Sequence, residues 1–294
     1  MSTSTSTPAA PARARRSDGP RLNFVRVLRS EWIKVTTVPS TVILLASTLV
    51  VMVGLAALFA WSLQTGQAQL DSGGPPPQMG PPGEPLPDFG DLARGAPSSG
   101  IIFGQLLIAS LAVVLIASEW ATGMIRSTMV AVPKRVPALL AKNVIAAGVS
   151  FLIGAAAALL SYVAAQPILA VEDLDFALTD DKIVASILNT GTYLALIAVI
   201  SMGIGTLLRN TAGGVVTAVG LFFVLPVIVV NLISGLADWI PDAARFLPTN
   251  AGERLVAVAA EEGALTQLEG GLVMAAWALV LLVASLLVTR RRDV

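Results

Sequence analysis

The residues best suited to form a binding site lie in one polar segment between two long apolar runs. They are Glu119, Trp120, Thr122, Gly123, Met124, Ile125 and Arg126. Gly123 has no Cβ, so backbone can turn or pack closely there, and Met124 and Ile125 offer apolar surface in a segment that otherwise faces water. Arg126 can form a charge-assisted hydrogen bond with Glu119 or with a carboxylate of a partner. The alternative is that Glu119 and Arg126 only mark a boundary with water.

Catalytic chemistry has few candidate residues in this sequence. The chain has no Cys and no His, which excludes thiol nucleophiles, disulfides and the commonest metal ligand and proton shuttle. The interiors of the apolar runs contain no Asp, Glu, Lys or Arg, although catalysis and ion-coupled transport both need such groups. A G-x-x-x-x-G-K-[ST] phosphate loop is also absent. We therefore predict no catalytic residues, no metal ligands and no cofactor.

The polar segment lies in a chain whose composition is that of a membrane protein. Hydrophobic residues make up 55% of the chain and charged residues only 13%, whereas charged residues make up about 25% of ordinary soluble domains. The lipid bilayer is therefore the expected surroundings of this chain. The net charge is zero, and no folded domain presents a basic face, which argues against nucleic acid as a partner.

Six apolar runs are each long enough to cross a hydrocarbon core of about 30 Å. They cover residues 41–63, 99–117, 144–165, 183–208, 212–233 and 271–289. The first run is longer than the roughly 7 to 15 residues of a signal-peptide core, so we interpret it as an uncleaved anchor. The sequence thus predicts an all-α integral membrane protein with six transmembrane helices.

The amino-terminal region divides into two parts. Residues 1–20 are rich in Ser, Thr, Pro and Ala and predict a disordered cytoplasmic tail. Residues 21–38 have an apolar helical face, which predicts an amphipathic interfacial helix or, alternatively, an ordinary extension of the first span. The apolar face consists of Val25, Leu28, Trp32 and Val35.

The other connecting segments are assigned by composition. Residues 64–98 are rich in Pro and Gly, which predicts an external loop without regular structure. Residues 234–270 mix aromatic and apolar residues with acids, which predicts an external loop that folds against the membrane surface or dips into it. Residues 290–294 form a basic cytoplasmic tail.

The basic residues predict the orientation in the membrane, because Lys and Arg resist translocation. With a cytoplasmic amino end, fifteen of the nineteen Lys and Arg residues lie inside, and fifteen of the nineteen Asp and Glu residues lie outside. Both termini are therefore predicted to be cytoplasmic.

Two stretches resemble a known family. Glu119-Trp-Ala-Thr-Gly-Met-Ile-Arg126, followed by Val132-Pro-Lys-Arg135 and Ala141-Lys142, resembles the acidic-aromatic, Gly, Ile-Arg signature of ABC-2 type transporter permeases. The tight turn between Gly203 and Gly214 is similar to that family's connection between its fourth and fifth spans. The resemblance extends over about residues 22 to 292, without the Pro-rich loop, and includes the six-span layout.

The resemblance implies a division of labour. Such a permease pairs with a second permease, identical or related, and with separate cytoplasmic ABC ATPase subunits that hydrolyse the ATP. Its first inner loop forms a short cytoplasmic coupling helix on the ATPase, a docking role that the resemblance gives to the seven residues from Glu119 to Arg126 named above. The expected activity is export of an apolar or amphipathic compound across a bacterial plasma membrane. The alternative is a membrane anchor or sensor without transport activity.

Overall fold

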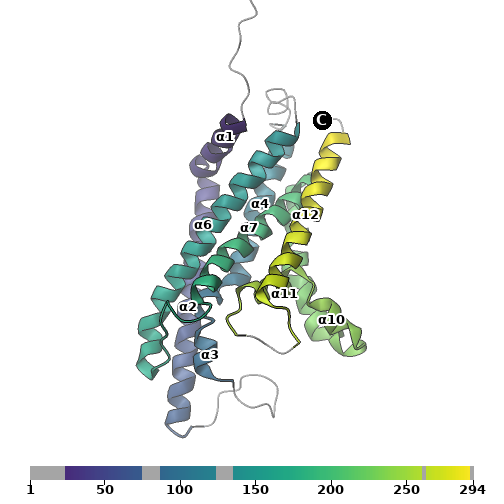
Figure 1. Ribbon diagram of the computed structural model, residues 1–294. Coiled ribbons are helices and arrows are strands. Elements are labelled where there is room, and N and C mark those ends of the chain that lie inside the picture. The colour runs from purple at the N-terminus through teal and green to yellow at the C-terminus, as the bar shows by residue number, and fades with distance from the viewer. Residues whose placement is uncertain (1–23, 75–86, 124–134, 260–262, 292–294) are drawn as a thin grey trace, which may run out of the picture.

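The computed structural model describes residues 24–74, 87–123, 135–259 and 263–291, and within them every regular element is helical. Six helical segments are long and apolar enough to cross a membrane, which confirms the predicted number of spans and indicates a multi-pass membrane protein (Figure 1). They are Pro39–Asp71, Phe89–Ala121, Val136–Glu172, Ile183–Leu208, Thr211–Ile228 and Gln267–Arg290.

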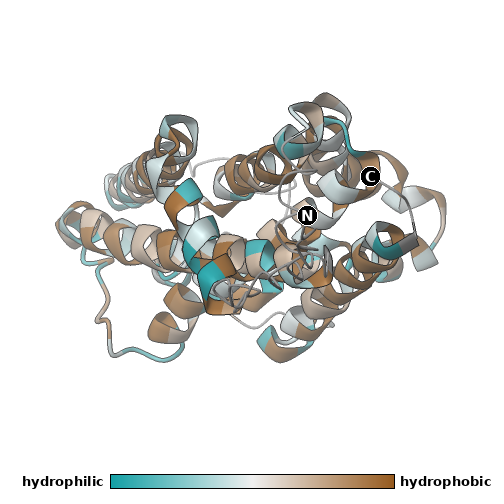
Figure 2. Ribbon diagram, turned by 90° about the horizontal axis from the view of Figure 1, so that it is seen from above, coloured by the Kyte–Doolittle hydropathy of each residue, from teal (hydrophilic) through white to brown (hydrophobic). Residues whose placement is uncertain are grey.

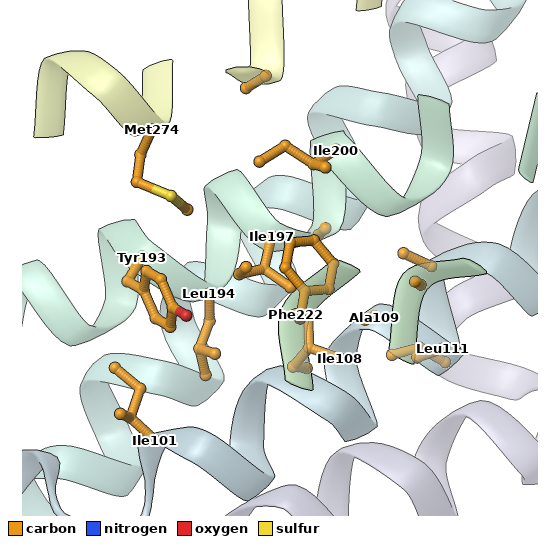
Figure 3. Close-up of a cluster of buried hydrophobic side chains, with 14 of the residues drawn as sticks. Ile101, Ile108, Ala109, Leu111, Tyr193, Leu194, Ile197, Ile200, Phe222 and Met274 are labelled. Carbon is orange, nitrogen blue, oxygen red and sulfur yellow. The ribbon is translucent and has the colours of Figure 1, made fainter. Parts of the chain in front are cut away.

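Helix α7 (Ile183–Leu208) lies at the centre of the bundle. It packs against α4 (Ile101–Ala121), α6 (Arg135–Leu169) and α12 (Gln267–Arg291). Its crossing with α6 is close, because a Cβ at Gly191 would lie only 2.7 Å from the Phe151 carbonyl oxygen. Figure 3 shows the core around α7, where Leu194 and Ile197 meet Ile108 of α4 and Phe222 of the fifth span.

The outer surface of the bundle is apolar. Large hydrophobic side chains such as Val50, Leu152 and Leu279 are well exposed on different long helices. Figure 2, seen along the bundle, shows that hydrophobic residues extend all round these helices. This is the pattern expected when lipid, rather than water, covers the outer face.

Helix α1 (Phe24–Thr37) precedes the first span, α2 (Pro39–Asp71), and packs against α6 and α2. Its exposed side includes Val25 and Trp32 from the predicted apolar face, whereas Val35 of that face is buried with Val27 and Glu31. Helix α1 and the last turn of α12 lie at the same end of the bundle (Figure 1), here called the α1 end.

The segment 64–98 contains helical structure that the sequence analysis does not predict. Helix α2 continues to Asp71, and α3 (Phe89–Ala93) and the short η1 (Ala96–Ser98) precede α4. The Asp88 side chain caps α3 by accepting a hydrogen bond from the Gly90 amide at 2.7 Å. Phe89 is buried against the first and third spans, so apolar contacts order the end of this Pro-rich segment. Residues 75–86 lie outside the described ranges.

The fifth span is irregular. After α8 (Thr211–Val219), the chain forms a π-helical segment η3 (Gly220–Val224), α9 (Leu225–Ile228) and a second π-helical segment, η4 (Val229–Ile233). Pro226 has no N–H to donate to the carbonyl of Phe222 four residues earlier. That carbonyl instead accepts hydrogen bonds from side chains of other elements, so the irregular span is tied to its neighbours.

Residues 234–270, predicted as a loop, contain η5 (Ser234–Leu236), α10 (Trp239–Ala244), α11 (Pro248–Val256) and the start of α12. Helix α11 packs against α7 and α12. Its Gly252 faces the ring of Tyr193, where a Cβ would lie 1.8 Å from Tyr193 Cε2. The glycine therefore allows α11 to approach α7 closely and to cover one end of the core.

Candidate functional site

Four charged side chains meet at the α1 end and form what we call the ion cluster: Glu31 and Lys34 of α1, Glu119 of α4 and Lys142 of α6. Lys34 Nζ donates to Glu31 Oε1 at 2.8 Å and to Glu119 Oε1 at 2.9 Å. Lys142 Nζ donates to Glu31 Oε2 at 2.5 Å and to Glu119 Oε1 at 2.9 Å. Lys34 thus connects its own helix to α4, whereas Lys142 bonds residues of two other helices, α1 and α4.

The cluster follows from helix geometry at each of its three elements. Glu31 and Lys34 are three residues apart and therefore share one face of α1. Glu119 lies in the last turn of α4, and Lys142 lies about two turns into α6. The cluster therefore fixes α1 to the two helices that flank the segment 122–134.

The charges of the cluster balance, because it contains two carboxylates and two ammonium groups. Glu31, Glu119 and Lys142 are 4%, 5% and 7% exposed, and an unpaired charge at such depth is strongly unfavourable. Burial opposes the charged form of Lys34, but hydrogen bonds and charges from Glu31 and Glu119 outweigh it and raise the pKa of Lys34 above its ordinary value. Lys34 therefore remains protonated at neutral pH.

One carboxylate oxygen in the cluster has no hydrogen-bond partner among the described residues. Glu119 Oε1 accepts from both lysines, whereas Glu119 Oε2 is buried and accepts no hydrogen bond from any residue that the structure describes. A pocket of about 340 Å³ lies beside the cluster and is lined by Glu31, Lys34, Glu119 and Lys142, together with apolar and hydroxyl side chains of α1, the start of α2, α4 and α6. The cluster thus combines balanced charges, an unused acceptor and an adjoining cavity.

A second contact holds the end of α4. The guanidinium carbon of Arg209 lies 4.0 Å from the ring centroid of Trp120, which is a cation–π geometry. Arg209 occupies the C-cap of α7 in a left-handed conformation with φ 54°, and Asn210 then caps α8 by accepting from the Gly213 amide at 2.8 Å. Trp120 therefore contacts the turn between the fourth and fifth spans.

The seven predicted docking residues have different surroundings. Glu119 is buried in the ion cluster and Trp120 is half-buried against Arg209. Thr122 and Gly123 are exposed, with Thr122 Oγ1 donating to the Ser118 carbonyl at 2.8 Å and Gly123 at φ 71°. Met124, Ile125 and Arg126 lie outside the described residues, and so do the predicted bond between Arg126 and Glu119 and any coupling helix in 124–134.

Sequence reasoning did not predict the ion cluster. It used Lys142 only for the family resemblance and the count of basic residues, gave no role to Glu31 or Lys34, and ended the second span at 117. The structure continues α4 to Ala121 and starts α6 at Arg135, so Glu119 and Lys142 become helical residues facing α1. The pairing of Glu31 with Lys34 at i, i+3 was the one local signal, but the other partners are 85 and 111 residues away in sequence.

A second buried polar group lies in the middle of the bundle. Tyr193 donates its hydroxyl to Gln105 Oε1, and Gln105 Nε2 donates to the Phe222 carbonyl at 3.2 Å. Thr249 of α11 also donates to that carbonyl, at 2.7 Å. This group, here called the mid-bundle network, links α4, α7 and α11 to the π-helical segment of the fifth span. Figure 3 shows Tyr193 and Phe222 on opposite sides of the Leu194–Ile197 turn.

The fold and these polar groups define a multi-pass membrane protein that holds a buried ion cluster at one end. Among the described residues, no group of three or more Asp, Glu, His or Cys side chains is arranged to hold a metal ion. No protein-family model matches the chain, and no curated protein matches it. Functional assignment therefore depends on the residues of the chain.

Proposed function

We propose that the chain is the membrane-spanning subunit of an ATP-driven ABC transporter of the ABC-2 type. The proposal is supported by six spans and by the resemblance of the Glu119–Arg126 and Gly203–Gly214 stretches to such permeases. In this proposal the ATPase is a separate cytoplasmic chain, and the termini of the permease are cytoplasmic in a bacterial plasma membrane. A second permease subunit, identical or related, completes the transporter.

The observation that carries the proposal is the position of the ion cluster. Glu119 is the first residue of the proposed docking segment, Glu119–Arg126, and Lys142 follows this segment, and both are bonded to α1. A force applied to the segment by a moving ATPase reaches α1, α4 and α6 together, because buried ion pairs resist separation. The contact of Trp120 with Arg209 extends this connection to the turn between α7 and α8. A coupling element requires this kind of continuity between a surface loop and the spans.

The cargo is proposed to be apolar or amphipathic. The six spans carry few charged side chains away from their ends, and the polar groups of the mid-bundle network bond one another or backbone carbonyls. A strongly charged solute would find little compensation for its lost hydration in such surroundings. The path would run between two permease subunits, and the direction would be export.

The test is purification of the tagged protein from its native host in mild detergent, followed by identification of co-purifying chains and measurement of ATP hydrolysis. We expect an ATPase subunit to be recovered with the wild type and with Gly73→Trp, but not with Gly123→Trp. The two glycines form a matched pair, because they have φ of 74° and 71° and a Cβ at either would meet nothing within 4 Å. They lie at opposite ends of the bundle, so backbone strain affects both and only Gly123 belongs to the docking segment.

Two outcomes would contradict the proposal. Recovery of the chain alone from the wild type, without ATP hydrolysis under conditions that preserve complexes, would favour a membrane anchor or sensor. Equal recovery of the ATPase with both tryptophan variants would place the docking surface elsewhere.

A further inference from the structure

The pocket beside the ion cluster has two chemically different parts. One side carries the four charged side chains. The remaining lining combines apolar side chains, among them Val35 and Val38 near the start of α2 and Leu115 of α4, with the hydroxyl side chains of Ser40, Thr41, Ser118 and Thr122. Such a division suits an amphipathic molecule with a polar head and an apolar body. Its position suits the same kind of molecule, because the pocket lies at the α1 end of the spans, where head groups are expected if the apolar helices cross the hydrocarbon core.

Besides the lining hydroxyls, the polar side of the pocket offers one ammonium donor and one carboxylate acceptor. An ammonium group has three N–H donors, and Lys34 uses two of them on Glu31 and Glu119 within the described residues. The Lys34 side chain is 31% exposed, so its third N–H can reach a ligand. The acceptor is Glu119 Oε2, a buried carboxylate oxygen that receives no hydrogen bond from the described residues.

The balance of charges determines which head group fits. Two carboxylates and two ammonium groups give the cluster no net charge, so it has no excess of positive charge with which to select an anionic lipid. A zwitterionic head group complements it best, with a phosphate oxygen accepting from Lys34 and a cationic N–H group donating to Glu119 Oε2. The donor must carry hydrogen, because an unused carboxylate oxygen gains a hydrogen bond only from an N–H or O–H group.

From these features we propose that the pocket binds a zwitterionic phospholipid whose head group ends in a primary ammonium, as in phosphatidylethanolamine. The lipid's phosphate bonds Lys34, its ammonium bonds Glu119 Oε2, and the first part of its acyl chains lies along Val35, Val38 and Leu115. The bound lipid completes the hydrogen bonding of Glu119 and so stabilises the junction of α1 with α4. The proposal concerns the chain alone and does not depend on an ATPase partner.

The experiment measures lipid binding to the full-length, delipidated protein by native mass spectrometry. Phosphatidylethanolamine and phosphatidylcholine with identical acyl chains form a matched pair, because they differ only in three N-methyl groups that replace the donating hydrogens. We expect phosphatidylethanolamine to bind about tenfold more tightly, the factor expected from one charge-assisted hydrogen bond. Phosphatidylglycerol of the same chain length, whose hydroxyls can donate but carry no positive charge, should bind less tightly than phosphatidylethanolamine.

Two variants locate the site without changing the ion cluster. Val38 lines the pocket and is 41% exposed, whereas Val42, one helical turn further along α2, does not line it and is 46% exposed. Val38→Trp should fill the pocket and abolish the preference for phosphatidylethanolamine, and Val42→Trp should retain it. Because both positions are at the lipid-facing surface, neither substitution should prevent folding.

Three results would overturn the proposal. Equal affinity for the ethanolamine and choline lipids would show that no N–H donor is required. An equal effect of Val38→Trp and Val42→Trp would place binding outside the pocket. Displacement of the lipid by the soluble head group glycerophosphoethanolamine at the lipid's own concentration would show that the pocket binds a free solute rather than a membrane lipid.

Discussion

Removing one charge from the ion cluster should be far more damaging than removing a balanced pair. Lys142→Met leaves Glu31 and Glu119, both at most 5% exposed, with Lys34 as their one remaining partner in the cluster. Breaking a buried pair in this way costs about 3–5 kcal/mol. At roughly 2 °C per kcal/mol for a chain of this size, the melting temperature in detergent should fall by about 6–10 °C.

The double variant Glu31→Gln/Lys142→Met removes one charge of each sign and retains the bond between Lys34 and Glu119, whose atoms lie 2.9 Å apart. The cluster again has no net charge, so the double variant should be at least about 1.5 kcal/mol more stable than the sum of the two single variants implies. The measurement is a double-mutant cycle of melting temperatures, in which unfolding is monitored by intrinsic tryptophan fluorescence in one detergent.

The control for this cycle is the exposed pair of Arg94 and Asp91, whose atoms lie 3.5 Å apart. Arg94→Met breaks an ion pair of the same sequence spacing as Glu31 and Lys34, but in water, so its melting temperature should change by no more than about 2 °C. Strictly additive effects at Glu31 and Lys142, or a Lys142→Met variant as stable as Arg94→Met, would refute the reasoning.

Three further predictions concern other described residues. Gly252→Ala should destabilise the protein by about 1–3 kcal/mol, because its Cβ would overlap the Tyr193 ring. Gly54→Ala, with nothing within 4 Å, should melt at or above the wild-type temperature, because alanine favours a helix interior more than glycine does. Tyr193→Phe removes the hydroxyl that bonds buried Gln105 Oε1 and should cost about 1–3 kcal/mol in the same assay; an unchanged melting temperature would show that the bond is unimportant. The pKa of Lys34 is raised, so the stabilisation from this residue should be complete below pH 10.5 and be lost as the pH rises through its higher folded-state pKa. Above pH 10.5 the wild type should therefore lose stability more steeply than Lys34→Met. Parallel pH profiles of the two proteins would contradict this.

The sequence was sufficient to predict the spans, because a run of about 20 apolar residues has few stable arrangements other than a transmembrane helix. It did not predict where those helices end. The second and third spans extend beyond 117 and before 144, since Glu119 and Lys142 are polar enough to resemble loop residues. Their burial becomes favourable through their bond to each other and through partners on α1, and hydropathy along the chain contains no information about partners that are distant in sequence.

The mid-bundle network also depends on partners that are distant in sequence, so the sequence did not predict it. Gln105, Tyr193 and Thr249 are isolated polar residues in the sequence, and hydroxyls in membrane helices usually bond their own helix, as Thr190 and Thr206 do here. Gln105 and Thr249 meet at the Phe222 carbonyl, which Pro226 cannot satisfy, and Tyr193 joins them by donating to Gln105. A proline four residues after a buried position therefore predicts a carbonyl available for side-chain donors, but only the packing of α4 and α11 supplies Gln105 and Thr249 to meet it. The fifth span thus depends on its neighbours for its shape, and displacement of α4 at the ion cluster has a physical connection to the π-helical segment η3 through Gln105.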